Sequence, residues 1–180
     1  DTRLVVRTGF CIGHCDRPVM SVLVTGAAGF IGSHLVGYLA SNTDSQIIGV
    51  DNFNTFYDPI IKRGHAQLLS RYDQFVLEEG DILSKDWLDG IFSKHRVQQV
   101  IHLAAWAGVR PSIQNPDIYF DVNINGTLNV LNCAKKYEVE RFLFASSSSV
   151  YGNNQKVPFS ESDPVDHPIS PYAATKRLAS

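Results

Sequence analysis

The sequence contains few cysteines, little net charge and no long apolar run. Its three cysteines are an odd number without the spacing of a disulfide framework, which favours a reducing compartment, so we expect a cytoplasmic protein. A formal net charge of -2 provides no basic face for nucleic acid or for an anionic membrane, and neither is expected as a partner. No apolar segment approaches the roughly 20 residues that span a bilayer, so we expect no transmembrane helix.

The first nineteen residues fit no targeting class, because they lack a basic start followed by an apolar block. Cys11, His14 and Cys15 offer three ligands where a structural zinc site requires four, so no metal is predicted. The only methionine, Met20, directly precedes the first clear strand. We therefore interpret residues 1–19 as a tail before the natural start of translation. The 44% apolar composition of the 180 residues suits one globular domain, which we place at residues 20–180.

Short β-branched runs alternate with longer helical stretches from Ser21 onward, which is typical of a parallel sheet covered on both faces. Right-handed crossovers then predict an α/β fold with a doubly wound parallel sheet, a Rossmann fold, with ligands beyond the carboxyl ends of the strands. The expected strands are residues 21–25, 46–51, 74–80, 98–105 and 141–147. The expected helices lie at residues 30–40, within 52–72, at 86–95, at 116–137 and from 171 onward. The last of these begins so close to the end that we expect a truncated domain.

Three glycines mark the turn between the first strand and the first helix, where TGAAGFIGSHL contains Gly26, Gly29 and Gly32. Glycines in this GxxGxxG turn permit positive φ, let the backbone approach a pyrophosphate and allow close packing of the helix on the sheet. A glycine pattern alone also suits a plain tight turn. Here it follows a strand, opens a helix and is followed by Asp51 at the end of the second strand, which together predict a dinucleotide site.

Asp51 bears on the kind of dinucleotide. A carboxylate at this position can accept hydrogen bonds from the adenosine ribose hydroxyls and repels a 2′-phosphate, so NAD is favoured over NADP. The alternative is an aspartate that merely ends a strand, since Asp is common at such turns.

Four consecutive serines, residues 146–149, follow the fifth strand, where a doubly wound sheet places its ligands. Further on, Tyr172 and Lys176 are four residues apart, which places them on one face of a helix. An ammonium group there favours the phenolate form of the tyrosine, which can then act as a base. By spacing alone, the two residues could equally form a plain surface pair.

Six motifs stand in the order found in extended short-chain dehydrogenases: TGAAGFIGSHL, VDNFNTFYDP, GDI, HLAAWAGVR, ASSSSVYG and YAATK. From Met20 to its end the chain resembles this family. Four stretches resemble UDP-glucuronate 4-epimerases more than UDP-galactose epimerases, namely DNFNTFYDPIIKR, AGVRPSIQNP, SSSSVYGNNQKVPFSESDPVDHP and SPYAATK. The similar sugar-nucleotide dehydratases carry an Asp-Glu pair where Ser148 and Ser149 stand, so water elimination is not expected.

The resemblance implies an NAD-dependent sugar-nucleotide 4-epimerase that interconverts UDP-glucuronate and UDP-galacturonate. Within it, Tyr172 is expected as the catalytic base, Lys176 as the residue that holds the nicotinamide ribose, and Ser147 as the hydroxyl that bonds the substrate's O4. Asp81 and Ile82 would flank the adenine. In addition to the three glycines and Asp51, the residues implied beside the cofactor are Phe30, Ile31, Asn52, Asp81, Ile82, Leu103, Ala104, Ala105 and Asn125, with Tyr172 and Lys176. Asn125 could also merely cap local backbone, and His102 is interpreted as a satisfied strand residue.

The implied reaction passes through a 4-keto sugar, with hydride moving from C4 to NAD and returning to the opposite face. A 4-keto glucuronate is a β-keto acid that can lose carbon dioxide, so its carboxylate must be restrained. Ser148 and Ser149 can supply neutral hydrogen bonds and Arg110 a charged one. Arg110 is equally compatible with a plain surface position.

Two other interpretations stay open at this point. One is another enzyme on the same scaffold, a neutral-sugar epimerase or a UDP-glucuronate decarboxylase, although the AGVR stretch resembles the epimerases. The other is an inactive NAD-binding fragment, because family members are much longer and hold the nucleotide-sugar with a C-terminal substrate domain that we expect to be missing. Relatives form homodimers through the face that includes the Tyr172 helix, so a homodimer is expected of the full-length protein.

Overall fold

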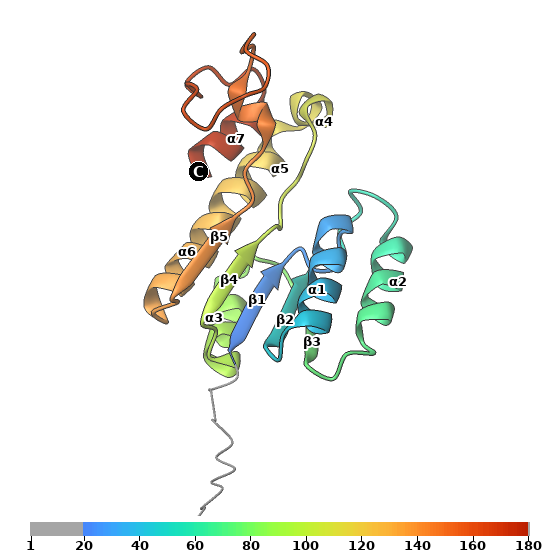
Figure 1. The fold of residues 1–180 in the computed structure, drawn as a ribbon. Helices are drawn as coiled ribbons and strands as arrows, with labels where there is room; N and C mark the ends of the chain where they lie inside the picture. The colour runs from blue at the N-terminus through green and yellow to red at the C-terminus, as the bar shows by residue number, and fades with distance from the viewer. Residues whose placement is uncertain (1–19, 180) are drawn as a thin grey trace, which may run out of the picture.

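Five parallel strands form the centre of the chain in the computed structural model, which describes residues 20–179 (Figure 1). They are β1 (Ser21–Thr25), β2 (Gln46–Asp51), β3 (Phe75–Glu79), β4 (Gln99–His102) and β5 (Arg141–Phe144). The strand order is β3-β2-β1-β4-β5, and every pairing is parallel. The order reverses between β1 and β4, which creates the switch point where such sheets bind ligands. The predicted doubly wound α/β fold is confirmed, whereas the tail at residues 1–19 lies outside the described residues.

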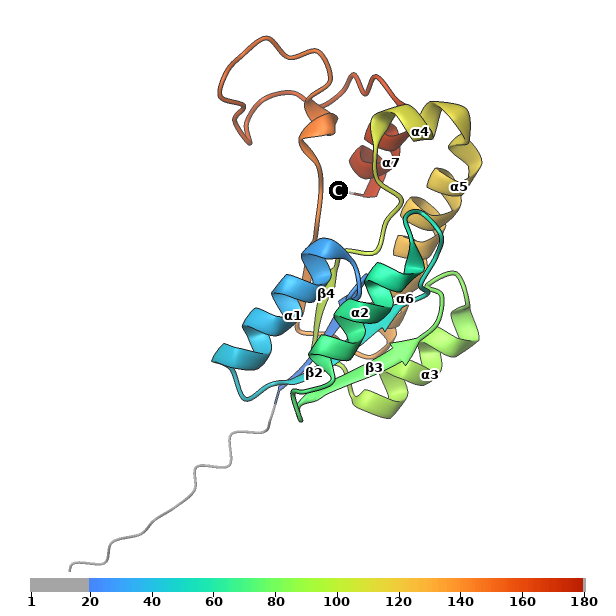
Figure 2. The same cartoon turned by 90° about the vertical axis from the view of Figure 1, so that its right-hand side faces the viewer.

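Helices cover both faces of the sheet (Figure 2). One face carries α1 (Phe30–Asn42) and α2 (Pro59–Leu69), and the other carries α3 (Lys85–His95) and α6 (Thr127–Lys136). Beyond the carboxyl ends of the strands lie α4 (Val109–Gln114), the short helical turn η2 (Ser148–Tyr151) and α7 (Pro171–Ala179). None of the helices within residues 20–179 is long and apolar enough to cross a membrane.

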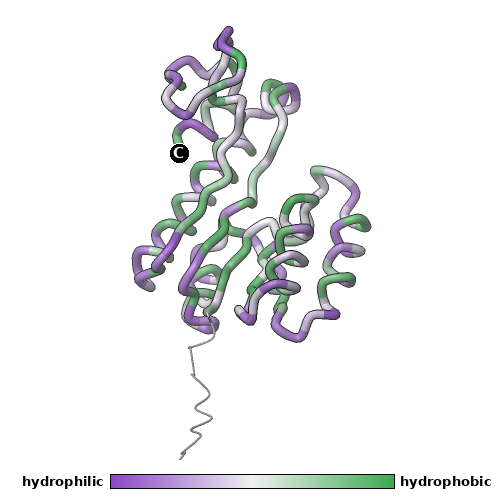
Figure 3. Tube along the Cα trace, in the orientation of Figure 1, coloured by the Kyte–Doolittle hydropathy of each residue, from purple (hydrophilic) through white to green (hydrophobic). Residues whose placement is uncertain are grey.

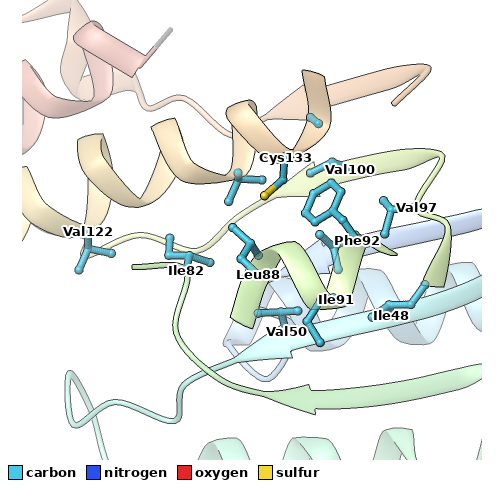
Figure 4. Close-up of a cluster of buried hydrophobic side chains, with 13 residues drawn as sticks. Ile48, Val50, Ile82, Leu88, Ile91, Phe92, Val97, Val100, Val122 and Cys133 are labelled. Carbon is cyan, nitrogen blue, oxygen red and sulfur yellow. The ribbon is translucent and has the colours of Figure 1, made fainter. Parts of the chain in front are cut away.

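The two faces of the sheet are apolar because successive side chains of a strand point in opposite directions. Val22 and Val24 of β1 pack under α1 and α2, whereas Leu23 between them packs under α3 and α6. Figure 4 shows the second cluster, in which Leu88 and Phe92 are fully buried against the sheet. Each such side chain contributes about 1.5–3 kcal/mol when it leaves water. Figure 3 accordingly shows the central strands as the most apolar part of the chain.

Two strands end earlier than the sequence predicts. β4 ends at His102 instead of residue 105, because the N–H groups of Leu103 and Ala104 both donate to the Thr25 hydroxyl oxygen at 3.1 Å. This hydroxyl turns the chain out of the sheet. β5 likewise ends at Phe144 instead of residue 147. The residues after both strands therefore lie at the open edge of the sheet, where they can contact a ligand.

The helix predicted at residues 116–137 consists of three joined parts: α5 (Pro116–Phe120), a π-helical turn η1 (Asp121–Gly126) and α6. The Thr127 hydroxyl donates to the Asn123 carbonyl oxygen at 2.7 Å within the wide turn. Gly126 adjoins Ile82, and a Cβ there would lie 2.6 Å from the Ile82 Cδ1 atom. The sequence analysis did not predict the π-helical turn or α4, which begins after Gly108 at φ 96°.

Candidate functional site

A pocket opens at the carboxyl ends of four neighbouring strands. Nine residues predicted beside a cofactor line it: Gly26, Gly29, Asp51, Asn52, Asp81, Ile82, Leu103, Ala104 and Ala105. The same pocket is lined by Asn54, Phe56, Tyr57 and Lys62 of the segment after β2, which the sequence analysis did not single out. The topology thus brings together residues that are widely separated in the sequence.

The glycine turn has the geometry of a phosphate-binding loop. Gly26 has φ 71°, a conformation that side chains rarely adopt, and its N–H donates to the Val50 carbonyl oxygen at 2.7 Å. Gly32 lies in α1, where a Cβ would collide with the Gly26 carbonyl oxygen. The first turn of α1 is therefore held close to the end of β1, and its free N–H groups attract an anion.

Asp51 is buried and joins the glycine turn to the end of β2. One of its carboxylate oxygens accepts the Ala28 N–H at 3.1 Å, and the other accepts the Phe53 N–H at 2.9 Å. Each oxygen retains further acceptor capacity toward the pocket. Asp51 thus joins the glycine turn to the end of β2, and its role as a cofactor ligand stays a prediction.

A second polar pair connects the next two strand ends. The Asn52 side-chain amide donates to the Asp81 carboxylate at 2.9 Å, and the other Asp81 oxygen accepts the Leu83 N–H at 2.9 Å. These contacts fix the rim of the pocket beside Ile82.

Lys62 lies on α2 and is 5% exposed, which is unusual for a lysine. Its Nζ donates to the Asn54 carbonyl oxygen at 3.1 Å and to the Asn54 side-chain oxygen at 2.8 Å. Burial lowers the pKa of Lys62, while the nearby Asp51 charge acts in the opposite direction. The pocket therefore contains a cation as well as carboxylates.

Six of the predicted cofactor residues do not line this pocket: Phe30, Ile31, Gly32, Asn125, Tyr172 and Lys176. The side chains of Phe30 and Ile31 are 70% and 68% exposed, so only their backbone groups lie at the helix start. Asn125 is exposed on η1, and its amide donates to Asp121 at 3.2 Å. The partner is the Asp121 side chain and not the backbone, so this contact differs from the backbone cap that the sequence analysis considered, and the cofactor role of Asn125 stays a prediction.

Tyr172 and Lys176 lie on α7, as predicted from their spacing. Lys176 is 4% exposed, and its Nζ lies 4.5 Å from the centre of the Phe144 ring. Burial lowers the pKa of Lys176 to about 8. The Tyr172 ring packs edge-on against Tyr119 with 6.2 Å between ring centres. These residues lie outside the pocket described above, on the neighbouring part of the same sheet edge.

The serines form a tight turn beside α7, which packs against η2. The Ser147 oxygen accepts the Ser149 N–H at 3.2 Å and its hydroxyl donates to the Ser149 Oγ at 3.2 Å. Ser148 is exposed, and so is Arg110 on α4. Of the predicted substrate residues, the structure therefore brings Ser147 and Ser149 into direct contact.

His102 is buried between two hydroxyl groups. Its Nδ1 lies 2.7 Å from the Thr25 Oγ1, which already accepts two N–H groups and therefore donates to the ring. Its Nε2 then donates to the Thr127 Oγ1 at 2.9 Å. Burial, with a smaller effect of the Lys176 charge, lowers the pKa of His102 to about 3. His102 is a neutral, satisfied strand residue, in agreement with its interpretation from the sequence.

Comparison with known proteins identifies the family of the chain. Residues 23–180 match the family model described as GDP-mannose 4,6 dehydratase. The chain belongs to this family of NAD-dependent epimerases and dehydratases. The resemblance to such enzymes is thereby confirmed.

Several relatives that resemble the chain are named as UDP-sugar 4-epimerases. UDP-glucuronate 4-epimerase 1 of Arabidopsis thaliana is 48% identical over 159 residues, which are 88% of this chain and 37% of that protein. The UDP-glucuronic acid 4-epimerase of Bacillus cereus, solved with UDP-glucuronic acid and NAD, has a TM-score of 0.82 at 37% identity, covering 89% of this chain and 50% of that one. The UDP-glucose 4-epimerase of Thermotoga maritima, solved with UDP-glucose, has a TM-score of 0.76 at 39% identity, covering 89% and 48%. The chain thus spans half or less of the length of these relatives.

One residue that positions the site in this member of the epimerase/dehydratase family was missed from the sequence. Asn123 is 1% exposed, and its amide bonds both the N–H and the carbonyl of Trp106, at 2.8 and 3.0 Å. It also donates to the Thr175 hydroxyl oxygen at 3.0 Å and so ties the chain after β4 to the Tyr172 helix. A signal was present, since Tyr119, Asn123 and Thr127 recur at a spacing of four on one helix face.

No group of three His, Cys, Asp or Glu side chains within the part of the chain that the structure describes could hold a metal ion. Cys11, His14 and Cys15 lie outside the described residues.

Proposed function

We propose that the protein is an NAD-dependent UDP-sugar 4-epimerase. The observation that carries the proposal is the arrangement at one sheet edge of a dinucleotide-type pocket and a helix that pairs Tyr172 with the buried Lys176. Binding and proton transfer would then occur side by side, beyond the carboxyl ends of the strands.

The residues of the pocket suit NAD. The glycine turn and the start of α1 would hold the diphosphate, the Asp51 carboxylate would accept the ribose hydroxyls, and Asp81 and Ile82 would lie beside the adenine. A carboxylate at the ribose site disfavours a 2′-phosphate, which supports NAD over NADP. The relatives from Bacillus cereus include structures solved with NAD, which supports the same choice.

NAD, when bound, would accept and return the hydride at C4 of the sugar. Tyr172 would hold and move the proton of the C4 hydroxyl, with Ser147 bonding the same oxygen. Lys176 would hold the nicotinamide ribose, and its positive charge would favour the phenolate form of Tyr172.

Within the UDP-sugars we propose UDP-glucuronate and UDP-galacturonate as the interconverted pair. The sequence resemblance and the UDP-glucuronate 4-epimerases among the relatives support this choice. Ser149, Ser148 and Arg110 would restrain the carboxylate against loss of carbon dioxide from the 4-keto sugar.

The deciding experiment is incubation of the full-length protein with UDP-glucuronate and, separately, with UDP-glucose, followed by NMR identification of the products. UDP-galacturonate is expected from the first and no turnover of the second. If UDP-glucose is converted to UDP-galactose, the substrate is a neutral UDP-sugar and not UDP-glucuronate. If UDP-glucuronate gives mainly a UDP-pentose, the enzyme is a decarboxylase. No turnover of either would reject the epimerase.

The carboxylate restraint has a separate test. Ser148→Ala and Ser149→Ala full-length proteins should release more UDP-pentose from UDP-glucuronate, relative to epimerised product, than the parent does. An unchanged product ratio in both variants would remove this role.

A homodimer of the full-length protein and a cytoplasmic location stay predictions of the same proposal. Sedimentation of the full-length protein would test the first.

A further inference from the structure

The segment between β2 and α2 contains a polar atom that the proposed mechanism does not use. Within residues 20–179, the Tyr57 hydroxyl is the only buried side-chain nitrogen or oxygen without a hydrogen-bond partner. A buried hydroxyl without a partner costs about 1–3 kcal/mol. Tyr57 lines the same pocket as the glycine turn and Asp51. A hydrogen-bond donor without an acceptor in a binding pocket indicates that a ligand group accepts its hydrogen bond.

The position of this hydroxyl indicates which part of a dinucleotide it would meet. It lies 3.9 Å from the point where a Cβ of Gly29 would stand, directly above the residue that precedes α1. That is the helix start, whose N–H groups attract phosphate charge. Burial and the negative charge of Asp51 raise the pKa of Tyr57, while the nearby Phe30 N–H, which does not meet the geometry of a hydrogen bond to this hydroxyl, acts weakly in the opposite direction. The phenol therefore keeps its proton at neutral pH and can donate it to an anion.

The segment that carries Tyr57 is held across the pocket from both sides. On the β2 side, the Lys62 Nζ lies 4.9 Å from the centre of the Tyr57 ring and also bonds Asn54. On the β4 side, the Phe56 ring packs edge-on against Trp106, with 5.3 Å between ring centres. Because Trp106 follows the pocket-lining Ala105, the Phe56–Trp106 contact closes the segment over the pocket.

We propose that the Tyr57 hydroxyl donates a hydrogen bond to the diphosphate of the bound dinucleotide, and that the Phe56–Trp106 contact closes residues 52–58 over it. The inference rests on the proposed cofactor site and deepens it. Residues 52–58 then slow release of the cofactor, which suits an enzyme that returns its hydride to the same sugar before the cofactor leaves.

The first test measures binding to the full-length protein freed of nucleotide, without any turnover. For Tyr57→Phe, calorimetry should give dissociation constants for NAD and for ADP-ribose about tenfold higher than those of the parent. Adenosine, which lacks the diphosphate, should bind both proteins equally in competition with NAD. Tyr38→Phe is the matched control, because Tyr38 lies on α1 with 65% exposure and does not line the pocket.

The outcomes separate this inference from the proposed function. Parent-like binding of NAD by Tyr57→Phe would overturn the inference and leave the cofactor site intact. An equal loss of affinity for adenosine would also overturn the inference, because the hydroxyl would then contact a part of the ligand other than the diphosphate. A parent protein that binds none of the three compounds would overturn the cofactor site and the inference with it.

The second test uses the two tryptophans of the chain. In a full-length variant with every tryptophan except Trp106 replaced by phenylalanine, Trp87 included, the emission of Trp106 should change when NAD binds because this ring contacts Phe56 of the closing segment. In that background, Phe56→Ala should release NAD about tenfold faster in a stopped-flow chase. An unchanged release rate would overturn the closing role of Phe56. Trp106 emission that does not change on addition of NAD would overturn the placement of the Phe56–Trp106 contact beside the cofactor.

Discussion

The two parts of the site are built differently. In the pocket at β1–β3, Asp51, Asn52 and Asp81 form hydrogen bonds with groups on the neighbouring strand ends, and β1 and β2 have partners on both sides. The part that carries Tyr172 adjoins the edge strand β5, where Leu143 is 53% exposed, and it depends on long-range contacts such as Asn123 to Thr175. This difference predicts that the proposed cofactor binding and the proposed proton transfer are separable, and four changes test the separation in order of decreasing effect.

Tyr172→Phe should have the largest effect. Loss of the hydroxyl to which we assign proton transfer should lower kcat about 10³-fold in the full-length enzyme, because general acid–base groups contribute on that scale. The ring would keep its contact with Tyr119, so the dissociation constant for NAD, measured by calorimetry, should stay within about twofold of the parent. A comparable loss of NAD binding would break the separation between the two parts.

Gly32→Ala should damage the pocket part selectively. The added Cβ would collide with the Gly26 carbonyl oxygen, so the free energy of unfolding should fall by more than about 3 kcal/mol, with loss of NAD binding. Gly64→Ala on α2 is the matched control, because nothing lies within 4 Å of its Cβ position. It should be stabilising by about 0.5–1 kcal/mol. Urea denaturation measures both, and equal effects would contradict the close packing of the turn.

Lys176→Met should stabilise the protein while abolishing activity. Burial lowers the pKa of Lys176 from 10.5 to about 8, so between these pH values the unfolded chain binds more protons than the folded one. The free energy of unfolding of the parent should therefore rise with pH across that window. At pH 7 the substitution should add about 3 kcal/mol to the free energy of unfolding, and the rise with pH should disappear.

Denaturation at pH 7 and at pH 10 measures the effect of Lys176→Met. A parent whose stability is flat between these pH values would show that the ammonium is not desolvated in the folded protein.

Asn123→Ala should lower the free energy of unfolding more than Asn125→Ala, although the two residues are close in sequence. Removing the Asn123 amide leaves the part-buried N–H and carbonyl of Trp106 without these partners, which should cost about 2 kcal/mol. The exposed Asn125 bonds only Asp121 among the contacts described, so its loss should cost less than about 0.5 kcal/mol. Thermal unfolding would compare the two variants, and the reverse order would contradict the structural role of Asn123.

Local patterns predicted the strands and most of the helices, because apolar periodicity and turn residues act over a few neighbours. The segment 21–25 matches β1 and 46–51 matches β2. The predicted end of β4 was wrong because the Thr25 hydroxyl oxygen, more than 70 positions earlier in the chain, accepts hydrogen bonds from the N–H groups of Leu103 and Ala104. Asn123 was missed for the same kind of reason, since its partner Thr175 is 52 residues away.

The sequence by itself determined the glycine turn, the acidic end of β2 and the spacing of Tyr172 and Lys176. Each of these depends on the residue type and on neighbours within one turn or strand. Only the tertiary structure decided that Lys62 and Tyr57 enter the pocket, that Lys176 is buried against Phe144, and that Phe30 and Ile31 turn their side chains to the surface. Burial and hydrogen-bond partners at such distances follow from how the strands assemble, which no local pattern encodes.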